Sequence, residues 1–262
     1  MNSHEMPDVQ SSHDARDIAI DQVGIKAIRH PVTLVDAGQQ QTSVAECQLT
    51  VGLPADRKGT HMSRFVALLN EGPLTLSIDT MAEWVRHMVE RLDANSGEAH
   101  FSLPFFVRKD APVSGQPAMM DYDVTLSGHL EHGRTRTMLR LLIPVTSLCP
   151  CSKEISAYGA HNQRSHITVE TEISDTSLSI RDLIDAVESQ GSCPLWGLLK
   201  RPDEKYITEY AFDNPKFVED MVRDVAAALD DYPGINGFTI NVENFESIHN
   251  HSAWAVIRRP AR

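Results

Sequence analysis

A short segment between residues 146 and 166 concentrates side chains that could do chemistry. It reads TSLCPCSKEISAYGAHNQRSH and contains Cys149, Cys151, Lys153, His161 and Arg164. Cysteine thiolate and imidazole are soft and borderline metal ligands, and the two cations could hold an anionic substrate. The whole chain has 4 cysteines, so two of them within three residues point to this segment as the place to look for an active site.

The cysteine spacing excludes some kinds of metal site. Pro150 separates Cys149 from Cys151 and fixes the backbone angle, which predicts an ordered bend with at most one thiol pointing into a site. The C-P-C spacing differs from the C-x-x-C of zinc ribbons and thioredoxin-like sites, so a four-cysteine structural zinc site is excluded. A mixed-ligand site stays open. A buried thiol beside a packing imidazole would give the same pattern, so more ligands must come from elsewhere.

Two polar segments could supply those ligands. Residues 202–206 (PDEKY) carry Glu204 and Lys205 in what we interpret as a loop between helices, where a solvated acidic surface is the alternative. Residues 243–251 (ENFESIHNH) form a predicted turn between the last two strands, where titratable groups can line a cleft. Three side chains of this second segment are candidates for catalysis: Glu246, His249 and His251.

Two further places carry charge near a predicted helix start. In the segment from Lys58 to Phe65, His61 and Arg64 would form a compact anion site with Lys58, unless the segment is a simple transition from loop to helix. Glu219 falls in the opening turns of a predicted helix, off its apolar stripe, so a carboxylate that complements the helix dipole is the alternative explanation.

The hydrophobic pattern predicts the elements that position these residues. Alternating apolar side chains predict strands at 23–27, 47–53, 99–108, 119–131, 138–145, 167–173 and 238–242, with a last segment near 252–258. Helical spacing predicts three helices, which begin behind a capping box at Thr80-x-x-Glu83, behind Ser179 with an end at Gly191, and at Asn214-Pro215. This order predicts an α+β fold of two similar halves, with antiparallel sheets and helices packed on one face. We expect a flexible segment at 1–18 and modules at 19–133 and 134–262.

Composition narrows the class of partner. The chain has 262 residues and a net charge of −12, from 36 acidic and 24 basic side chains, which disfavours nucleic acid. An anionic small molecule would need a local basic pocket. No apolar run suits a signal peptide or a membrane span, so we expect no membrane partner and a cytoplasmic location. In that reducing compartment the thiols are expected to be free.

Four segments together resemble a known family, the prokaryotic type IB GTP cyclohydrolases. They read DVQSSHDARDIAIDQVGIKAIRHP, GTHMSRF, SLCPCSKEISAYGAHNQRSHITV and NFESIHNHSA, and the resemblance runs from about residue 8 to the end. It implies two tandem tunnelling-fold modules per subunit and assembly into an oligomeric barrel, a homotetramer in members of this type, with active sites near interfaces. It also implies hydrolysis of GTP to 7,8-dihydroneopterin triphosphate and formate, the first step of folate-type pterin synthesis.

The resemblance assigns roles to individual residues. It implies one divalent metal per site, zinc, manganese or ferrous iron, held by Cys149, His161 and Glu204. It assigns binding of the guanine to Glu219. It assigns catalysis to Glu246, His249 and His251, together with Cys149. For the triphosphate we nominate a pool of cations: Lys153, Arg164, Lys205, His61 and Arg64.

Three alternatives remain open on the sequence. An archaeal-type relative would use ferrous iron and form a cyclic-phosphate pterin. A tunnelling-fold nitrile reductase would use a cysteine nucleophile and a nicotinamide site, and it would not lose activity on chelation. A metal-stabilised binding module would unfold when its metal is removed.

Overall fold

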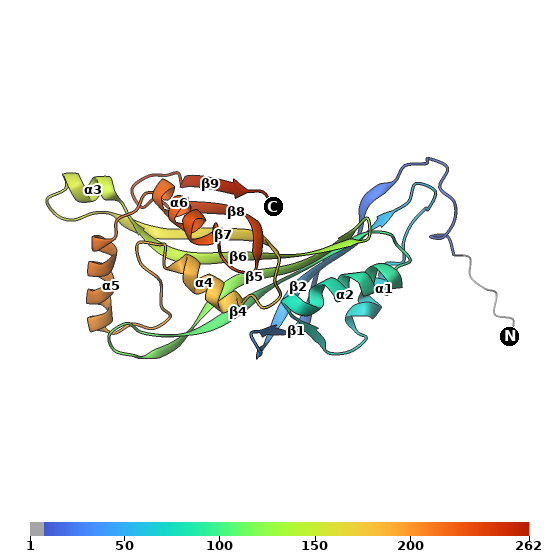
Figure 1. Cartoon of the computed structure of the whole chain (residues 1–262), viewed down its shortest axis with the longest axis horizontal. Coiled ribbons are helices and arrows are strands. Elements are labelled where there is room, and N and C mark those ends of the chain that lie inside the picture. The colour runs from blue at the N-terminus through green and yellow to red at the C-terminus, as the bar shows by residue number, and fades with distance from the viewer. Residues whose placement is uncertain (1–7, 262) are drawn as a thin grey trace. The chain divides into compact units, whose positions relative to one another are not determined.

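The computed structural model describes residues 8–261 (Figure 1). Its helices are α1 (Met62–Leu69), α2 (Ile78–Arg91), α3 (Pro150–Ile155), α4 (Ile180–Glu188), α5 (Arg201–Asp213) and α6 (Val218–Leu229). Its strands are β1 (Ile20–Asp36), β2 (Gln39–Leu53), β3 (Leu74–Leu76), β4 (Gly97–Asp110), β5 (Pro117–Glu131), β6 (Arg134–Leu148), β7 (Asn162–Ile173), β8 (Ile235–Asn244) and β9 (Ala253–Arg259).

The strands pair in the order β3-β1-β2-β4-β5-β6-β7-β8-β9. The pairs β2–β4, β6–β7, β7–β8 and β8–β9 are antiparallel, while the short β3 runs parallel to β1. The predicted α+β class with a mainly antiparallel sheet is therefore confirmed. Within the described residues, no helix is both long and apolar enough to span a bilayer.

The chain divides into two compact units, each built from several stretches of sequence. Of the described residues, unit 1 comprises 8–34, 42–102 and 126–137, and unit 2 comprises 35–41, 103–125 and 138–261. Because both units are discontinuous, the expected modules at 19–133 and 134–262 stay predictions, as does an oligomeric barrel. Of the segment expected to be flexible, residues 1–7 lie outside the described chain, whereas Asp14 N donates to Asp56 O at 2.9 Å.

In unit 1, α2 packs its apolar stripe on the paired strands β2 and β4. Cys47 lies opposite Phe101 in this ladder, and both are fully buried with Val85 of α2. Helix α2 begins two residues before Thr80, which corrects the predicted start. Its N-cap is Ser77, whose hydroxyl accepts from Thr80 N at 3.1 Å, and the stripe extends back to Ile78, which is buried.

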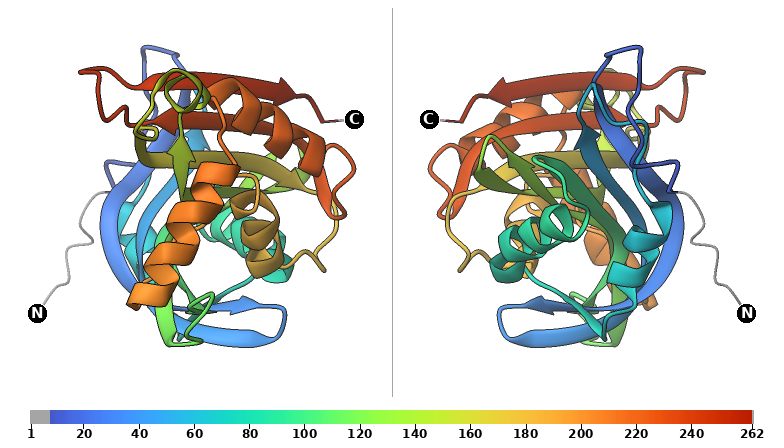
Figure 2. Two further views of the ribbon diagram at one scale, coloured as in Figure 1. Left: turned by 90° about the vertical axis from the view of Figure 1, so that its left-hand side faces the viewer. Right: turned by 90° about the vertical axis from the view of Figure 1, so that its right-hand side faces the viewer.

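In unit 2, α4 and α6 pack together, and α6 lies along β8 and β9 (Figure 2). The predicted Ser179 cap of α4 is confirmed by its bond from Asp182 N at 3.1 Å. The buried Asp36 adds a second cap, because its carboxylate accepts from Ile180 N at 2.7 Å and from Arg181 N at 3.0 Å. Two orphan N–H groups of this helix end are thereby satisfied by a residue far away in sequence.

The structure corrects the prediction for residues 202–206, which lie in α5 and not in a loop. All of α5 lies within the described residues, and its buried residues are Asp203 and Ala211. The segment therefore has no apolar stripe from which a helix could be predicted. Asp203 fixes the start of α5 by accepting from Lys200 N, Val113 N and Ser114 N, each at 2.8 Å. Burial opposes ionisation of Asp203, but the hydrogen bonds from Ser114, Lys200 and Val113 outweigh it and hold its pKa below the ordinary range.

A second correction concerns Asn214-Pro215, which does not open a helix. Asn214 is the C-cap of α5, and α6 begins at Val218 behind Phe217. At the start of α6, the backbone N–H of the N-cap residue Phe217 donates to the carboxylate of Asp220 at 2.9 Å. Asn214-Pro215 is thus the connection between two helices.

Candidate functional site

Cys149 lies where β6 ends and α3 begins. Its backbone N–H donates to His161 O at 3.1 Å, and its thiol accepts from Ser152 N at 3.5 Å as the N-cap of α3. Pro150 is the first residue of α3, so the predicted bend is a helix start. Cys149 is half-buried and Cys151 is exposed, and all four cysteines are free. The backbone of Cys149 is therefore held beside the backbone of His161.

The imidazole of His161 ends a row of hydrogen bonds that crosses three strands. Its Nδ1 lies 3.0 Å from Gln163 Oε1, and Gln163 Nε2 donates to Ser147 Oγ at 2.7 Å. Ser147 Oγ lies 2.8 Å from Ser165 Oγ, which donates to Asn244 Oδ1 at 2.7 Å. Ladder register explains the row, because Ser147 lies opposite Gln163 and Ser165 lies opposite Asn244.

The row has a direction because each hydroxyl has one proton to donate. Asn244 Oδ1 can only accept, so the Ser165 proton goes to it and the Ser147 proton goes to Ser165. Ser147 Oγ then accepts from the Gln163 amide, which turns Gln163 Oε1 towards His161. This arrangement favours the tautomer of His161 with the proton on Nδ1, in which Nε2 keeps a lone pair available to a metal.

The loop from β8 to β9 lies beside this histidine. Ser247 Oγ is 3.5 Å from His161 Nδ1. The predicted turn at 243–251 is confirmed from residue 245 onward, since β8 continues to Asn244. In this loop the rings of His249 and His251 stack with centroids 5.1 Å apart. Lys216 N donates to Leu148 O at 3.0 Å, which brings the start of α6 against the last residue of β6. Glu219 belongs to the first turn of that helix and is exposed.

Glu204 is not gathered with Cys149 and His161. Among the described residues, the three potential metal-ligand atoms that lie within 4.8 Å of one another belong to Glu98, His100 and His129. The contact of α3 with α5 is at the far end of α5, where Lys153 Nζ donates to Phe212 O at 2.5 Å and lies 4.3 Å from the Phe212 ring centroid. Glu204 precedes Phe212 by about 12 Å along the helix axis, at ~1.5 Å per residue.

The predicted phosphate-binding cations fall in several places. Lys205 is paired with Glu209 at 2.5 Å on the surface of α5. Arg164 lines a cavity of about 690 Å³ in unit 2, together with Tyr158, Trp196 and Phe212. Since successive side chains of a strand point to opposite faces, Arg164 projects from the face of β7 opposite that of Gln163 and Ser165.

His61 and Arg64 belong to unit 1. His61 precedes α1, and its Nε2 lies 3.2 Å from Asp8 Oδ2, so the imidazole faces a carboxylate. Arg64 is exposed on α1. The expected compact anion site therefore contains an acidic neighbour in this structure.

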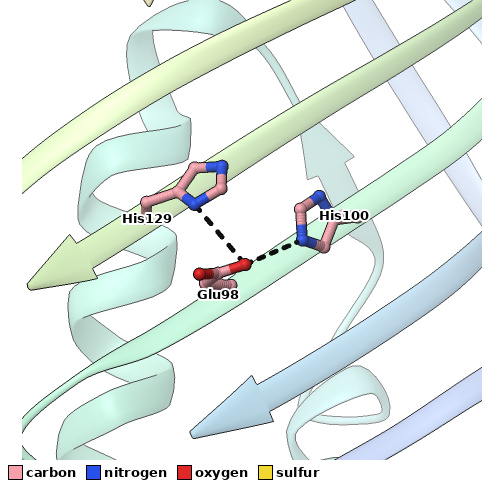
Figure 3. A group of neighbouring side chains, drawn as sticks. All are labelled: Glu98, His100 and His129. Atoms are coloured by element: carbon pink, nitrogen blue, oxygen red, sulfur yellow. Dashed lines mark hydrogen bonds and ion pairs between the residues drawn. The ribbon is translucent and has the colours of Figure 1, made fainter. Parts of the chain in front are cut away.

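A second cluster, missed by the sequence analysis, is formed in unit 1 by Glu98, His100 and His129 (Figure 3). Glu98 Oε2 lies 3.3 Å from His100 Nε2 and 3.6 Å from His129 Nδ1. Burial lowers the pKa of His129, which favours a neutral imidazole that can bind a cation. This triad, Glu98/His100/His129, is a candidate site for a divalent metal.

The sequence carried one signal for the triad. Glu98 and His100 are two residues apart at the start of the predicted strand 99–108, and because β4 begins at Gly97 the two side chains share a face. Their partner was hidden because His129 lies on another predicted strand, 119–131, and periodicity does not say which strands pair; the structure places it on β5, which ends at Glu131.

Comparison with known proteins gives one consistent result. The family model described as Type I GTP cyclohydrolase folE2 matches residues 6–255. The chain is 54% identical to GTP cyclohydrolase FolE2 of Azoarcus sp., an alignment that covers 100% of this chain and 99% of the relative. It is also 54% identical to GTP cyclohydrolase FolE2 of Burkholderia multivorans, over 98% of this chain and 96% of the relative.

Among solved structures, uricase from Arthrobacter globiformis is similar in fold. The TM-score is 0.53 at 8% sequence identity, with 91% of this chain and 93% of the uricase chain covered. At this identity the likeness concerns the fold alone.

Proposed function

Because the chain belongs to the Type I GTP cyclohydrolase folE2 family, we propose that it hydrolyses GTP to 7,8-dihydroneopterin triphosphate and formate, as a type IB enzyme of folate-type pterin synthesis. One observation carries the assignment of the site: the bond from Cys149 N to His161 O at 3.1 Å. It holds a thiol and an imidazole with a free Nε2 on adjacent segments.

The donor set at Cys149 and His161 fits a divalent metal. One thiolate and one neutral imidazole suit zinc, manganese or ferrous iron, and a carboxylate from Glu204 would complete three protein ligands with one position open. A metal there supplies Lewis acidity that makes water a nucleophile near neutral pH.

We assign the third ligand to a second copy of the chain. In one copy Glu204 is about 12 Å along α5 from the contact with α3, by ~1.5 Å per residue, and Asp203 anchors that end of α5 to Val113 and Ser114. Helix α5 also exposes Tyr206 at 42% and Tyr210 at 39%, which an oligomer would cover. A homo-oligomer, a tetramer as the resemblance implies, would then build each site from two copies.

The remaining residues act on the nucleotide. Opening the imidazole ring of guanine requires attack at C8, which becomes electrophilic when N7 is protonated, so His249 is proposed as the proton donor with His251 and Glu246 beside it. Glu219 would accept from the guanine N1–H and 2-amino group, which adenine cannot match. Lys153, Arg164, Lys205, His61 and Arg64 remain the pool for the triphosphate.

The reaction is tested with chelator-stripped protein. We would add GTP with manganese, zinc or ferrous iron, and measure formate release and pterin fluorescence after oxidation. Restored formate with a triphosphorylated pterin is the expected result. Folded protein that releases no formate with any metal would refute the proposal, and a cyclic-phosphate product would indicate the archaeal-type reaction.

The shared site is tested by mixing inactive variants. Cys149→Ala and Glu204→Ala chains, unfolded together and refolded, should regain part of the activity, because some mixed sites combine an intact Cys149 with an intact Glu204. The matched control mixes Cys149→Ala with His161→Ala. Both residues come from the same copy, so that mixture should stay inactive. Equal recovery in both mixtures would refute the sharing of Glu204.

A further inference from the structure

We propose that the triad of unit 1, Glu98/His100/His129, is a second site for a divalent transition-metal ion such as zinc or ferrous iron, separate from Cys149. Two strands supply the ligands, because Glu98 and His100 lie on β4 and His129 lies on β5. Figure 3 shows both imidazole rings directed at one oxygen of Glu98. The chemistry differs from that of Cys149, since only nitrogen and oxygen ligands are present.

The spacing of the three atoms suits a tetrahedral ion. Metal–ligand bonds of about 2.0–2.1 Å place tetrahedral ligand atoms about 3.3 Å apart. The observed separations from Glu98 Oε2 are 3.3 Å to His100 Nε2 and 3.6 Å to His129 Nδ1. Small side-chain movements would therefore complete the coordination.

One histidine is already oriented for a metal. Ser127 Oγ lies 2.8 Å from His100 Nδ1, and in the tautomer in which it accepts from Nδ1–H the lone pair of Nε2 is directed at Glu98. A nitrogen lone pair and a carboxylate oxygen repel each other unless a proton or a cation lies between them. The pairing of His100 with Glu98 is thus favourable for a cation.

A buried hydroxyl beside the triad lacks a partner. Thr50 is 8% exposed, and in the described chain its Oγ1 is the buried side-chain oxygen without a hydrogen bond. Thr50 lies directly opposite Glu98 in the β2–β4 ladder, so both side chains project from the same face. A water in the fourth position of the metal would give Thr50 the donor that it lacks.

The fourth position also has space around it. Thr50, Glu98 and His129 line a cavity of about 540 Å³ in unit 1. Asp21, Glu131 and Arg136 also line it, so carboxylates outnumber cations. Two imidazoles, one carboxylate and an open position beside a cavity match the ligand sets of zinc and non-haem iron sites.

Cobalt(II) tests this proposal, because its spectrum separates the two sites. The full-length, metal-stripped protein is titrated with Co²⁺, and bound cobalt is counted after desalting. A site with Cys149 gives thiolate-to-cobalt charge-transfer absorption, whereas the triad gives only ligand-field bands. We expect two cobalt ions per chain, and we expect Cys149→Ser to abolish the charge-transfer band while one ion without it stays bound.

Variants of the triad give the complementary result. His129→Asn and the isosteric Glu98→Gln should each lose one cobalt ion per chain and keep the charge-transfer band. The matched control is His132→Asn, which changes an exposed histidine three residues away and should bind as the parent does. Loss of all bound cobalt in Cys149→Ser, or unchanged stoichiometry in both triad variants, would overturn the proposal. Neither result bears on formate release, which tests the proposed reaction separately.

Discussion

Replacing Gln163 tests whether the row of hydrogen bonds sets the protonation of His161. Gln163→Leu keeps a similar volume at this buried position but removes the acceptor for His161 Nδ1–H and the donor to Ser147. Loss of a partner that orients a metal-binding histidine typically weakens the metal by about 10- to 100-fold. That factor corresponds to about 1.4–2.7 kcal/mol of binding free energy.

Gln163→Glu is the control that separates orientation from packing. A carboxylate still accepts from His161 Nδ1–H, and its second oxygen can accept from Ser147. The Ser147 oxygen then accepts from Ser165, and the Asn244 amide turns over to donate to Ser165. All partners remain satisfied with the row reversed, so we expect Gln163→Glu to escape the loss of about 10- to 100-fold that removal of the partner causes.

Metal affinity is measured by competition between stripped protein and a fluorescent chelator, with manganese as the probe and circular dichroism as the check on folding. Equal affinity of Gln163→Leu and the parent would refute the orientation argument. Equal weakening in Gln163→Leu and Gln163→Glu would show that an acceptor for His161 Nδ1–H is not what sustains metal affinity, because the isosteric Gln163→Glu keeps both that acceptor and the packing.

Three further predictions address stability and substrate recognition. Lys109→Met should lower the free energy of unfolding in urea by about 3–5 kcal/mol, because Lys109 Nζ lies 2.6 Å from the buried Glu188, whose charge would then have, among the described residues, no cation beside it and only the Tyr122 hydroxyl as a donor. Asp203→Asn should destabilise the fold at pH 7, and since the pKa of Asp203 is lowered in the folded state, the difference from the parent should shrink as pH falls below about 3.9. Glu219→Gln should reduce kcat/KM for GTP about 10- to 150-fold, from ~1.5–3 kcal/mol per hydrogen bond to a charged group, with an unchanged melting temperature because Glu219 is exposed.

Each of these predictions has a result that would contradict it. Lys205→Met removes an exposed ion pair and should cost at most about 1 kcal/mol; a similar cost for Lys109→Met would mean that burial of the pair is unimportant. A pH-independent effect of Asp203→Asn would exclude its charge as the cause. For Glu219→Gln, unchanged discrimination between GTP and ATP would remove Glu219 from the guanine site.

Periodicity predicted the elements that bury an apolar face. The alternation through Ile167, Val169 and Thr171 gave β7, and the stripe of Val218, Met221 and Val225 gave α6, because burial of one face imposes the pattern. Helix α5 was not predicted because it buries few apolar side chains. Its start is fixed by hydrogen bonds from distant backbone N–H groups to Asp203. Such a partner cannot be read from local sequence.

The same distinction applies to the sites. The sequence allowed Cys149 and His161 to be expected near each other, since twelve residues separate them across a Tyr-Gly-Ala bend, and the backbone bond between them agrees with this. The row behind His161 depends on ladder register, which places Ser147 beside Gln163 and Ser165 beside Asn244. Register between strands far apart in the chain follows from the folded sheet, so periodicity could not reveal that row.

The hydrogen-bond row behind His161 can form only after β8 has been synthesised and paired. One of its members, Asn244, lies on β8, which the ribosome synthesises after every other strand except β9. A slip of β8 by one residue would turn Asn244 to the other face and leave Ser165 without its acceptor. A nascent or misaligned chain therefore lacks the row of acceptors behind the His161 imidazole. With His161 as the proposed metal ligand, metal loading would then report on completed, correctly registered folding.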